Sequence, residues 1–429
     1  MEIKILNGEM EKDILSRLIK RSPENYPEQE KTVKDIVDHV RREGDRAVFS
    51  YEEKFDHIVL NKENFEVTGE ELDEAYAAVD QKLLEILRKA LSNIRAFHEK
   101  QKTESWFSAE GDGILLGQKV TPLDRVGVYV PGGKAAYPSS VLMNIVPAKV
   151  AGVKEIVMTT PVGPEGKVYA STLVAAREAG ADRIFKCGGA QAIAALAFGT
   201  DLIPRVDKIV GPGNIYVALA KKAVFGHVGI ESVAGPSEIL VLADKDANPV
   251  FVAADLMSQA EHDEMASAIL ITDDRDFAER VNAEIERQLP TLSRKEIIEK
   301  SLENFGFLLV AGSMEEAIGT VNRIAPEHLE IHTAEPYDIM TKIKNAGAIF
   351  LGPWSSEPLG DYFAGPNHVL PTNGTARFFS PLSVDAFVKR SSIISYDRNA
   401  LERVHDSIEA FAEWESLTAH ANSIRKRFE

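Results

Sequence analysis

The stretch RVGVYVPGG, residues 125–133, decides the fold class, because a short apolar run ends there in a proline and two glycines. The run 125–130 predicts a buried strand, and the turn Pro131-Gly132-Gly133 leads into a predicted helix at 140–151. Strand-like and helix-like patterns then alternate as far as about residue 351. They form two successive runs with a break near Ala234-Gly235-Pro236. Alternation of this kind predicts βαβ units around parallel sheets.

The period of the apolar residues places the individual elements. In the first run we expect strands at 125–130, 155–160, 183–187 and 208–210, with helices at 140–151, 168–179, 191–198 and 214–225. In the second run we expect strands at 238–242, 268–272, 307–310, 329–332 and 348–351, with helices at 248–262, 275–288, 314–324 and 336–345. Helices are also predicted at 10–20, 31–43 and 70–101, and the tail 399–429 predicts one or two amphipathic helices. The sequence therefore predicts an α/β fold with two tandem, incomplete Rossmann-like parallel-sheet domains and smaller helical parts at both ends.

We divide the chain into four predicted parts. A mainly helical region, part of which packs on the second α/β domain, covers 1–118, and the first α/β domain covers 119–233. The second α/β domain covers 234–382, and a helical tail covers 383–429. Within the second domain, 353–382 is rich in Gly, Pro, Asn and Ser, which is typical of a functional loop.

Composition excludes several classes of protein. The 429 residues suffice for two or three domains with a sizeable core, and 44% hydrophobic with 27% charged residues is typical of a soluble globular protein. A net charge of −17 disfavours nucleic-acid binding. The single cysteine, Cys187, excludes an intrachain disulfide and fits a reducing cytoplasm. We see no signal-peptide pattern and no membrane-spanning apolar run, so we expect a cytoplasmic protein.

Three glycine-rich turns each follow a predicted strand and precede a predicted helix. They are Pro131-Gly132-Gly133, Gly188-Gly189-Ala190-Gln191 and Gly211-Pro212-Gly213-Asn214. One such turn alone is more typical of ordinary βα connections, but three in one domain indicate a nucleotide or phosphate pocket. The standard dinucleotide fingerprint is absent, since Tyr216 stands where its third glycine would be, and there is no Walker A loop.

Ligand-type side chains recur in the second domain. Gln259 and His262 are three residues apart at the end of a predicted helix, so both can reach one cation, although such a pair is more often merely solvated. Glu327 and His328 precede a predicted strand and could act as acid and base. Asp361 and His368 lie in the irregular loop, and Glu415 and His420 lie in the tail, where a solvated helix face is the simpler interpretation. Because clefts in open α/β sheets form beyond the carboxyl ends of strands, we expect the polar clusters there.

Several long motifs resemble the histidinol dehydrogenase family, in order and at matching spacing over nearly the whole chain. The motifs are GVYVPGG (127–133), VGPGN (210–214), AGPSE (234–238), QAEHD (259–263), APEHLE (325–330), GDY (360–362) and GPNHVLPT (365–372), with the tail around Glu415 and His420. The resemblance implies oxidation of L-histidinol to L-histidine through a bound aldehyde, with two NAD⁺ reduced, in the last steps of histidine biosynthesis. It also implies a homodimer in which the tail of one subunit reaches the site of the other.

The resemblance further implies a set of site residues. One Zn²⁺ per site would be held by Gln259, His262, Asp361 and His420. L-Histidinol would contact Ser237, Gln259, His262, His328, Asp361, Glu415 and His420, with His368 as a weaker candidate. His328 would take the alcohol proton, and Glu327 would activate water for the second oxidation. NAD⁺ would contact Tyr129, Gln191 and Asn214, which puts NAD⁺ in the first α/β domain and zinc with substrate in the second.

Three other functions use the same residues differently. A zinc hydrolase would use Glu327 as the base on water and would need no NAD⁺. A non-catalytic metal-binding or assembly protein would bind zinc without turnover. A thiol-dependent aldehyde dehydrogenase would use Cys187 as its nucleophile, although a small buried packing residue is the simpler interpretation of this cysteine.

Overall fold

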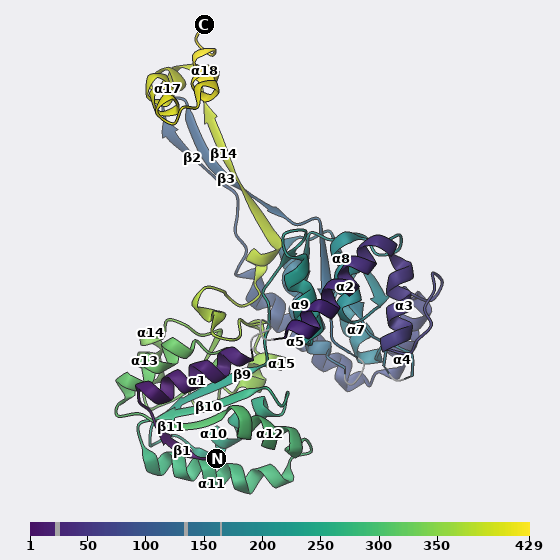
Figure 1. The fold of residues 1–429 in the computed structure, drawn as a ribbon, viewed down its shortest axis with the longest axis vertical. Coiled ribbons are helices and arrows are strands. Elements are labelled where there is room, and N and C mark those ends of the chain that lie inside the picture. The colour runs from purple at the N-terminus through teal and green to yellow at the C-terminus, as the bar shows by residue number, and fades with distance from the viewer. Residues whose placement is uncertain (22–25, 133–135, 164) are drawn as a thin grey trace. The chain divides into compact units, whose positions relative to one another are not determined.

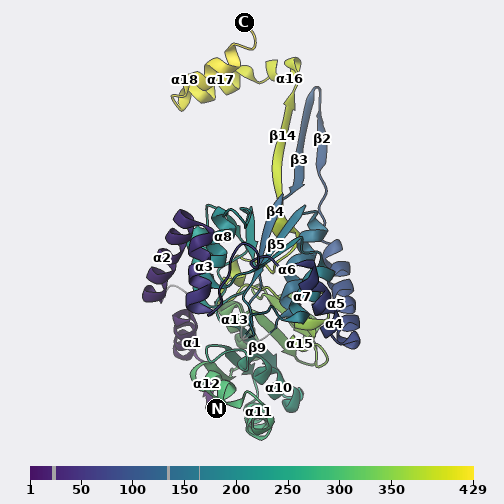
Figure 2. The same ribbon diagram turned by 90° about the vertical axis from the view of Figure 1, so that its right-hand side faces the viewer.

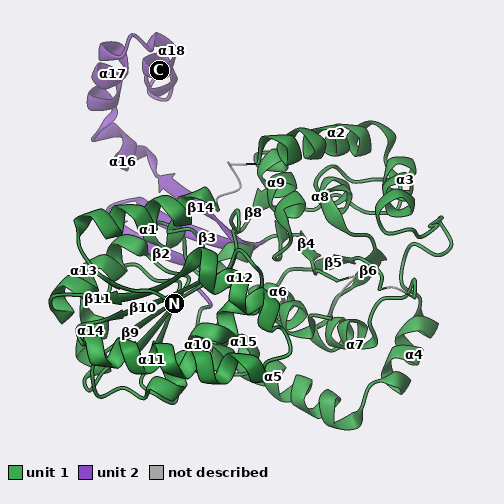
Figure 3. Cartoon of the chain, turned by 60° about the horizontal axis from the view of Figure 1, so that its bottom comes forward, with its two compact units in different colours: residues 1–101, 123–387 green, residues 102–122, 388–429 purple. Residues whose placement is uncertain are grey.

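The computed structural model describes residues 1–21, 26–132, 136–163 and 165–429 of the chain. They form two compact units, coloured separately in Figure 3. Unit 1 comprises Met1–Gln101 and Leu123–Phe387 and contains two parallel sheets. Unit 2 comprises Lys102–Pro122 and Val388–Glu429 and contains one antiparallel sheet. Among the residues described, no helix is both long and apolar enough to cross a bilayer.

The first parallel sheet of unit 1 has the strand order β6-β5-β4-β7-β8. Its strands are β4 (Arg125–Tyr129), β5 (Glu155–Thr160), β6 (Arg183–Lys186), β7 (Lys208–Val210) and β8 (Gly229–Ile230). Its connecting helices are α6 (Pro138–Ala151), α7 (Ala170–Ala179), α8 (Gly189–Phe198) and α9 (Ile215–Val224). Helices α2 (Pro27–Glu43), α3 (Asp45–Phe55), α4 (Gly69–Ala78) and α5 (Gln81–Glu99) add to its outer layers. The strand order reverses at β4 and β7, which makes their carboxyl ends a switch point.

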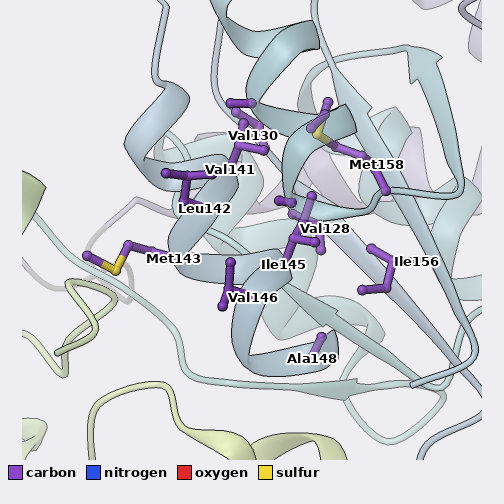
Figure 4. Close-up of a cluster of buried hydrophobic side chains, with 14 of the residues drawn as sticks. Val128, Val130, Val141, Leu142, Met143, Ile145, Val146, Ala148, Ile156 and Met158 are labelled. Carbon is purple, nitrogen blue, oxygen red and sulfur yellow. The ribbon is translucent and has the colours of Figure 1, made fainter. Parts of the chain in front are cut away.

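Both faces of this sheet are buried under helices. Val128 and Met158 pack with α5, α6 and α7, whereas Val157 and Phe185 pack with α2, α3, α8 and α9. Figure 2 shows these two helix layers on opposite sides of β4 and β5, and Figure 4 shows the side chains of α6 packed against both strands. A sheet covered on both faces needs apolar residues at successive positions, which explains the continuous apolar run at 125–130.

The second parallel sheet has the order β1-β11-β10-β9-β12-β13. Its strands are β1 (Ile3–Ile5), β9 (Glu238–Ala243), β10 (Ser267–Thr272), β11 (Gly306–Val310), β12 (His328–His332) and β13 (Ala348–Leu351). Its helices are α1 (Gly8–Lys20), α10 (Pro249–Ala260), α11 (Arg275–Gln288), α12 (Lys295–Phe305), α13 (Met314–Ile324), α14 (Pro336–Lys342) and α15 (Glu357–Tyr362). Short 3₁₀ turns lie at Leu289–Thr291, Thr375–Arg377 and Val384–Phe387.

This sheet is also covered on both faces. Leu240 and Leu242 pack with α1, α13 and α14, whereas Val241 and Leu270 pack with α10, α11 and α12 (Figure 1). Strand β1, far ahead of the others in the chain, completes the edge by pairing with β11 in parallel. The second parallel sheet therefore uses residues from both ends of unit 1.

Unit 2 is built around an antiparallel sheet with the order β14-β3-β2. Its strands are β2 (Trp106–Gly111), β3 (Ile114–Pro122) and β14 (Val388–Tyr396), followed by α16 (Arg398–Glu402), α17 (His405–Trp414) and α18 (Thr418–Arg425). Most side chains of β2 and β14 are exposed, and Ile394 is 74% exposed. The sheet thus carries apolar side chains with little covering of its own.

The predicted fold class is confirmed, with differences in detail. The segment 70–101 forms two helices rather than one, because the chain is extended at Val79 and the Asp80 side chain caps α5 by accepting from the Lys82 backbone N–H. We did not predict strands β1, β2, β3, β8 and β14 or helices α3, α12 and α15 from the sequence, and the last of these lies in the segment expected to be an irregular loop. Gly133, the end of the first glycine-rich turn, lies outside the described residues. The four-part division of the chain stays a prediction.

Candidate active site

The candidate active site is built on the turn between α13 and β12. Ala325 ends α13 at φ 54°, a left-handed conformation that a non-glycine residue rarely adopts, and Pro326 follows it. Directly before β12, the Glu327 carbonyl accepts from the Ala348 N–H at 2.8 Å. Gly347 passes so close that a Cβ there would lie 2.5 Å from the Glu327 carbonyl oxygen. This packing fixes Glu327 and His328 at the start of a central strand.

Glu327 and His328 are both buried and share one neighbouring residue, Glu238. The Glu327 Oε2 accepts from the Glu238 backbone N–H at 2.8 Å, and the His328 Nδ1 lies 3.0 Å from the Glu238 carbonyl oxygen. The His328 Nδ1 also lies 3.6 Å from Glu327 Oε2. A proton on Nδ1 therefore has an acceptor in the backbone, which leaves Nε2 to act on another molecule. Nε2 is buried and has no hydrogen-bond partner among the described residues.

Helix α10 brings Gln259 and His262 to the same place. Gln259 lies in the last turn of α10 and is only 1% exposed, yet no described residue donates a hydrogen bond to its Oε1. His262 follows the helix end, where its N–H bonds to the Gln259 carbonyl. Part of His262 is exposed to solvent. Atoms packed around its ring nevertheless disfavour the charged imidazolium and lower the pKa of His262. A neutral imidazole and a free amide oxygen are ligands that Zn²⁺ accepts.

Helix α15 supplies two carboxylates, of which the sequence indicated only Asp361. Ligand atoms of His262, Glu357 and Asp361 all lie within 4.8 Å of one another. Asp361 Oδ1 lies 3.8 Å from His328 Nε2 and 3.7 Å from His368 Nδ1, and the same His368 nitrogen lies 3.1 Å from the Asp361 carbonyl oxygen. Glu357 was missed because a lone glutamate in a loop has no local signal. Only its position on the same short helix as Asp361 identifies it.

Burial and charge set the protonation of these groups. Burial raises the pKa of Glu327 to about 8 and, with the neighbouring Asp361, that of Glu357 to about 8. Burial disfavours the imidazolium of His328, but the carboxylates of Glu327 and Asp361 outweigh it and raise its pKa to about 10. Burial also disfavours the Asp361 carboxylate, but His328 and His368 lower its pKa to about 2. Asp361 is thus ionised at neutral pH, as a metal ligand must be.

The expectation that the polar cluster would lie beyond the carboxyl ends of the strands is wrong for the second sheet. Glu238, His328 and Ala348 are the first residues of β9, β12 and β13, so the cluster lies at the amino ends of three adjacent strands. The helices that connect parallel strands run antiparallel to them, so each helix ends near the edge where the strands begin. Residues that follow a helix, such as His262, therefore reach this edge. Helix ends rather than strand ends therefore supply the metal-type ligands.

Residues from distant segments support this edge. Ser237 directly precedes β9, and its carbonyl accepts from the Ser267 N–H. Arg21, at the end of α1, is 1% exposed and pairs with the Glu238 carboxylate. Arg21 also donates to the Met265 carbonyl at 2.8 Å. The buried Arg21 thus fixes the Glu238 side chain by an ion pair. The backbone of Glu238 in turn hydrogen-bonds Glu327 and His328.

The three predicted NAD⁺ contacts lie at or beyond the carboxyl ends of strands in the first sheet. Tyr129 ends β4, Gln191 lies in the first turn of α8 after β6, and Asn214 caps α9 after β7 by accepting from the Tyr216 and Val217 N–H groups. Gly211, at φ 119°, lies so close to Tyr129 that a Cβ would meet its carbonyl oxygen. The glycine-rich turns here therefore bring backbone segments together at the switch point.

Beside Gln191 lies a buried carboxylate, Glu52, that the sequence did not indicate. Glu52 of α3 accepts from the Gln191 side chain at 2.8 Å and from the Gly188 N–H at 3.1 Å. Burial raises the pKa of Glu52 to about 8, and burial also raises the pKa of the adjacent Asp56. Cys187 is fully buried, and burial with the charge of Glu52 raises its thiol pKa. Such a thiol is a poor nucleophile, which disfavours the thiol-dependent mechanism.

The substitution Glu52→Gln is expected to stabilise the protein more at pH 8 than at pH 5. The unfolded carboxyl ionises near 4.5 and the buried one near 8. Between these values the unfolded state binds fewer protons, so wild-type stability falls as pH rises, by up to about 1.4 kcal/mol per pH unit. Glutamine keeps the acceptor for Gln191 but does not titrate. Free energies of unfolding from urea denaturation at pH 5, 6, 7 and 8 would measure the difference.

The control for this measurement is Glu53→Gln, the exposed neighbour of Glu52 on α3. It should follow the wild-type pH dependence. A Glu52→Gln variant whose stability runs parallel to wild type from pH 5 to 8 would show that Glu52 is ionised in the folded protein across this range.

Glu415 and His420 belong to unit 2. Glu415 caps the end of α17, His420 lies on α18, and both are exposed. Helix α17 also carries Phe411 and Trp414, and Trp414 is 90% exposed. Of the predicted site residues, unit 1 thus brings Ser237, Gln259, His262, Glu327, His328 and Asp361 to the amino edge of one sheet. Glu415 and His420 are carried separately by unit 2.

Comparison with known proteins gives one family. The family model for histidinol dehydrogenase matches residues 19–428. The chain is 57% identical over 427 residues to histidinol dehydrogenase of Bacillus subtilis, covering 100% of this chain and 99% of that protein. It is 58% identical over 402 residues to that of Geobacillus kaustophilus, covering 94% of each.

The solved structures agree with these relatives. The crystal structure of histidinol dehydrogenase from Elizabethkingia anophelis is similar with a TM-score of 0.92 at 36% identity, covering 100% of this chain and 97% of that one. With its amino-edge cluster of His, Glu, Asp and Gln side chains, and with matches that run almost from end to end, the chain is an oxidoreductase that belongs to the histidinol dehydrogenase family.

Proposed function

We propose that the chain oxidises L-histidinol to L-histidine with two NAD⁺, through L-histidinaldehyde that stays bound, as the final steps of histidine biosynthesis. The observation that carries the proposal is the buried Glu327–His328 pair beside the ligand-type residues Gln259, His262 and Asp361. A four-electron oxidation needs a base for the alcohol and a base for water, and this pair offers both in one place.

Zn²⁺ is the proposed metal, held by Gln259, His262 and Asp361 together with His420. The residues of unit 1 fit it, since Gln259 offers a buried oxygen, His262 a neutral imidazole and Asp361 an ionised carboxylate. Burying the Gln259 Oε1 without a hydrogen-bond partner costs free energy, and binding of this oxygen to the metal ion would offset that cost. Bound there, Zn²⁺ would hold and orient the nitrogens of the substrate and would favour the neutral form of His328.

His328 is the proposed base for the alcohol. The Glu238 carbonyl accepts the proton on Nδ1, which directs the basic Nε2 toward substrate. Glu327 is the proposed base for the water that adds to the aldehyde. The Glu238 N–H fixes Oε2, and burial raises the pKa of Glu327 to about 8, which makes its ionised form a stronger base than an ordinary carboxylate. Ser237 and Glu415 are proposed to contact the substrate.

NAD⁺ is proposed to bind at the switch point of the first sheet, at Tyr129, Gln191 and Asn214. Gln191 is held by Glu52, and Tyr129 accepts from the Gly189 N–H at 3.2 Å, so the side chains there have fixed positions. Helix N-termini with close backbone approach favour the pyrophosphate even though the third glycine of the usual fingerprint is missing. When bound there, NAD⁺ would supply the hydride acceptor for each oxidation.

A cytoplasmic homodimer is the proposed state of the protein. Unit 2 exposes apolar side chains on its sheet and on α17, among them Phe107, Ile394, Phe411 and Trp414. A three-stranded sheet with exposed apolar side chains is stabilised by a covering layer, and a second copy of the chain would provide one. In such a dimer, Glu415 and His420 would serve the site of the partner.

The test is the amount of NADH formed per L-histidinol consumed, followed by absorbance. Two NADH per substrate are expected, with activity lost on chelation and restored by Zn²⁺. Zinc-loaded, folded protein that yields no NADH would contradict the proposal, and turnover of an ester or amide without NAD⁺ would favour the zinc hydrolase instead.

A further inference from the structure

Strand β12 carries three polar side chains on one of its faces. His328, Glu330 and His332 alternate with Leu329 and Ile331, which pack on the opposite face with α1, α13 and α14. All five residues are buried. His328 belongs to the proposed catalytic pair, whereas Glu330 and His332 lie farther along the strand and have no part in the proposed reaction. A buried carboxylate costs free energy unless its oxygens have partners, so the partners of Glu330 indicate its function.

One oxygen of Glu330 is bonded to the first residue of α15. Glu330 is 0% exposed, and its Oε1 accepts from the Glu357 backbone N–H at 2.7 Å. The first N–H groups of a helix have no partner within the helix, and the side chain of the N-cap residue commonly accepts from one of them. The N-cap residue of α15, Ser356, makes no such bond. Glu330 therefore caps α15 from a strand that lies 27 residues earlier in the chain.

The other oxygen of Glu330 lies beside His332. His332 Nε2 is 3.2 Å from Glu330 Oε2 and 3.8 Å from Asp255 Oδ2 on α10. Among the residues that the structure describes, no lysine or arginine is paired with either carboxylate. A proton on His332 Nε2 therefore lies between the two acidic groups. With Oε2 next to this ring, Oε1 of Glu330 is directed at the start of α15.

Helix α15 depends on its neighbours for its position. It has six residues, too few for a helix to be stable by itself. Gly360 lies so close to β13 that a Cβ there would be 2.7 Å from Phe350 Cε1. The Ser258 hydroxyl of α10 lies 3.2 Å from Glu357 Oε2. The bond from Glu330 adds to these contacts by fixing the backbone at the first residue of the helix.

Asp361 lies one turn after Glu357 on α15, so the two side chains share a helix face. Ligand atoms of Glu357, Asp361 and His262 lie within 4.8 Å of one another. Asp361 Oδ1 also lies 3.8 Å from His328 Nε2. Metal–ligand distances vary by only about 0.2 Å, so a small shift of α15 would take Asp361 out of reach of a metal ion that His262 also binds.

We propose that Glu330 is a positioning residue of the active site, which caps α15 from β12 and thereby holds Asp361 in place for the metal ion and for His328. His332 and Asp255 assist by holding the second oxygen of Glu330. The inference rests on the proposed function, in which Asp361 is a zinc ligand. Glu330 acts through α15 and contacts neither the substrate nor the metal ion. Residues that orient metal ligands typically contribute about 10–100-fold to metal affinity.

Three substitutions of Glu330 test the proposal. Glu330→Met removes the acceptor, Glu330→Asp draws the carboxylate back by one methylene, and Glu330→Gln keeps an oxygen that can accept from the Glu357 N–H. Zinc affinity, measured by competition with a zinc-chelating dye, should fall about 10–100-fold in the Met and Asp variants and much less in the Gln variant. Hydrogen–deuterium exchange in 352–363 should be faster in the same two variants.

Kinetics separate positioning from a general loss of stability. In Glu330→Met and Glu330→Asp, KM for L-histidinol should rise by a larger factor than kcat falls, whereas KM for NAD⁺ should not change. Glu335→Met is the matched control, because it makes the same substitution at an exposed glutamate, and it should behave as wild type in every measurement. Circular dichroism checks the fold, and Glu330→Asp decides the question should Glu330→Met fail to fold.

Wild-type exchange and wild-type zinc affinity in Glu330→Asp would overturn the proposal. Equal losses in Glu330→Gln would also overturn it, because the charge of Glu330 rather than its bond to α15 would then matter. Faster exchange in α15 with unchanged zinc affinity would contradict the link to Asp361. A wild-type protein that binds no zinc would contradict the proposed function instead, and the exchange in α15 would then decide by itself whether Glu330 holds this helix.

Discussion

Replacing Glu327 by glutamine is expected to reduce the yield from two NADH to about one per L-histidinol, with the aldehyde oxidation slowed by about 10²–10⁴-fold. Glutamine has the shape of glutamate, and its Oε1 can still accept from the Glu238 N–H that now binds Glu327. It cannot take a proton from water, so hydration of the aldehyde loses its base. The first oxidation, which uses His328, should change far less.

The two half-reactions can be measured separately. L-Histidinol with an aldehyde trap reports the first oxidation, and L-histidinaldehyde supplied directly reports the second. Glu335→Gln is the matched control, because Glu335 is an exposed glutamate ahead of α14 and should leave both rates unchanged. Equal losses in both half-reactions of Glu327→Gln would show that the two residues do not divide the work as proposed.

Mixing two inactive variants is expected to restore activity, if the site is shared between subunits. His328→Asn removes the base in unit 1, and His420→Asn removes the proposed ligand in unit 2. Each variant alone should lose about 10²–10⁴-fold in kcat. In a hybrid dimer, unit 1 of the His420 variant meets unit 2 of the His328 variant, which rebuilds one intact site. Random pairing after co-expression should then recover about a quarter of wild-type activity.

The control is co-expression of two variants that both affect unit 1, His328→Asn and His262→Asn. A dimer of these chains has no intact unit 1, so no activity should return. If His328→Asn with His420→Asn also stays inactive although the hybrid dimers are isolated by two different tags, each chain uses its own tail and the proposed exchange is wrong.

Helices and strands could be predicted where the pattern of apolar residues along the sequence matches the burial of those residues in the fold. Strand β5 (Glu155–Thr160) lies where we predicted it, because Ile156, Val157 and Met158 are successive apolar residues, as a strand covered on both faces requires. The hairpin β2–β3 and strand β14 were missed for the opposite reason. Their side chains are largely exposed, and β14 pairs with β3 across more than 260 residues, so no local pattern distinguishes them from loops.

The sequence indicated residues that the structure brings together, but not where in the fold they lie. Gln259 and His262 share a helix end, so their spacing predicted that both side chains reach one place, and a common ligand for them stays a prediction. The sequence could not show that the cluster lies at the amino ends of β9, β12 and β13, because a sequence motif does not determine the edge of the sheet at which it lies. Arg21, Glu52 and Glu357 had no signal at all, since each acts on partners far away in the sequence.

The pairing of β1 with β11 also determines an order of events on the ribosome. Ile3–Ile5 is made about 300 residues before Gly306–Val310, which at typical translation speeds of roughly 5–20 residues per second means a wait of about 15–60 s. All five strands of the first parallel sheet, β4 to β8, are made in this interval, because they lie within residues 125–230. Until β9 and β10 are made, the apolar side of α1, with Ile14 and Leu18, has no sheet to cover it. Slowing or stalling synthesis between these two points prolongs the time in which a chaperone or a second nascent chain can capture the first twenty residues.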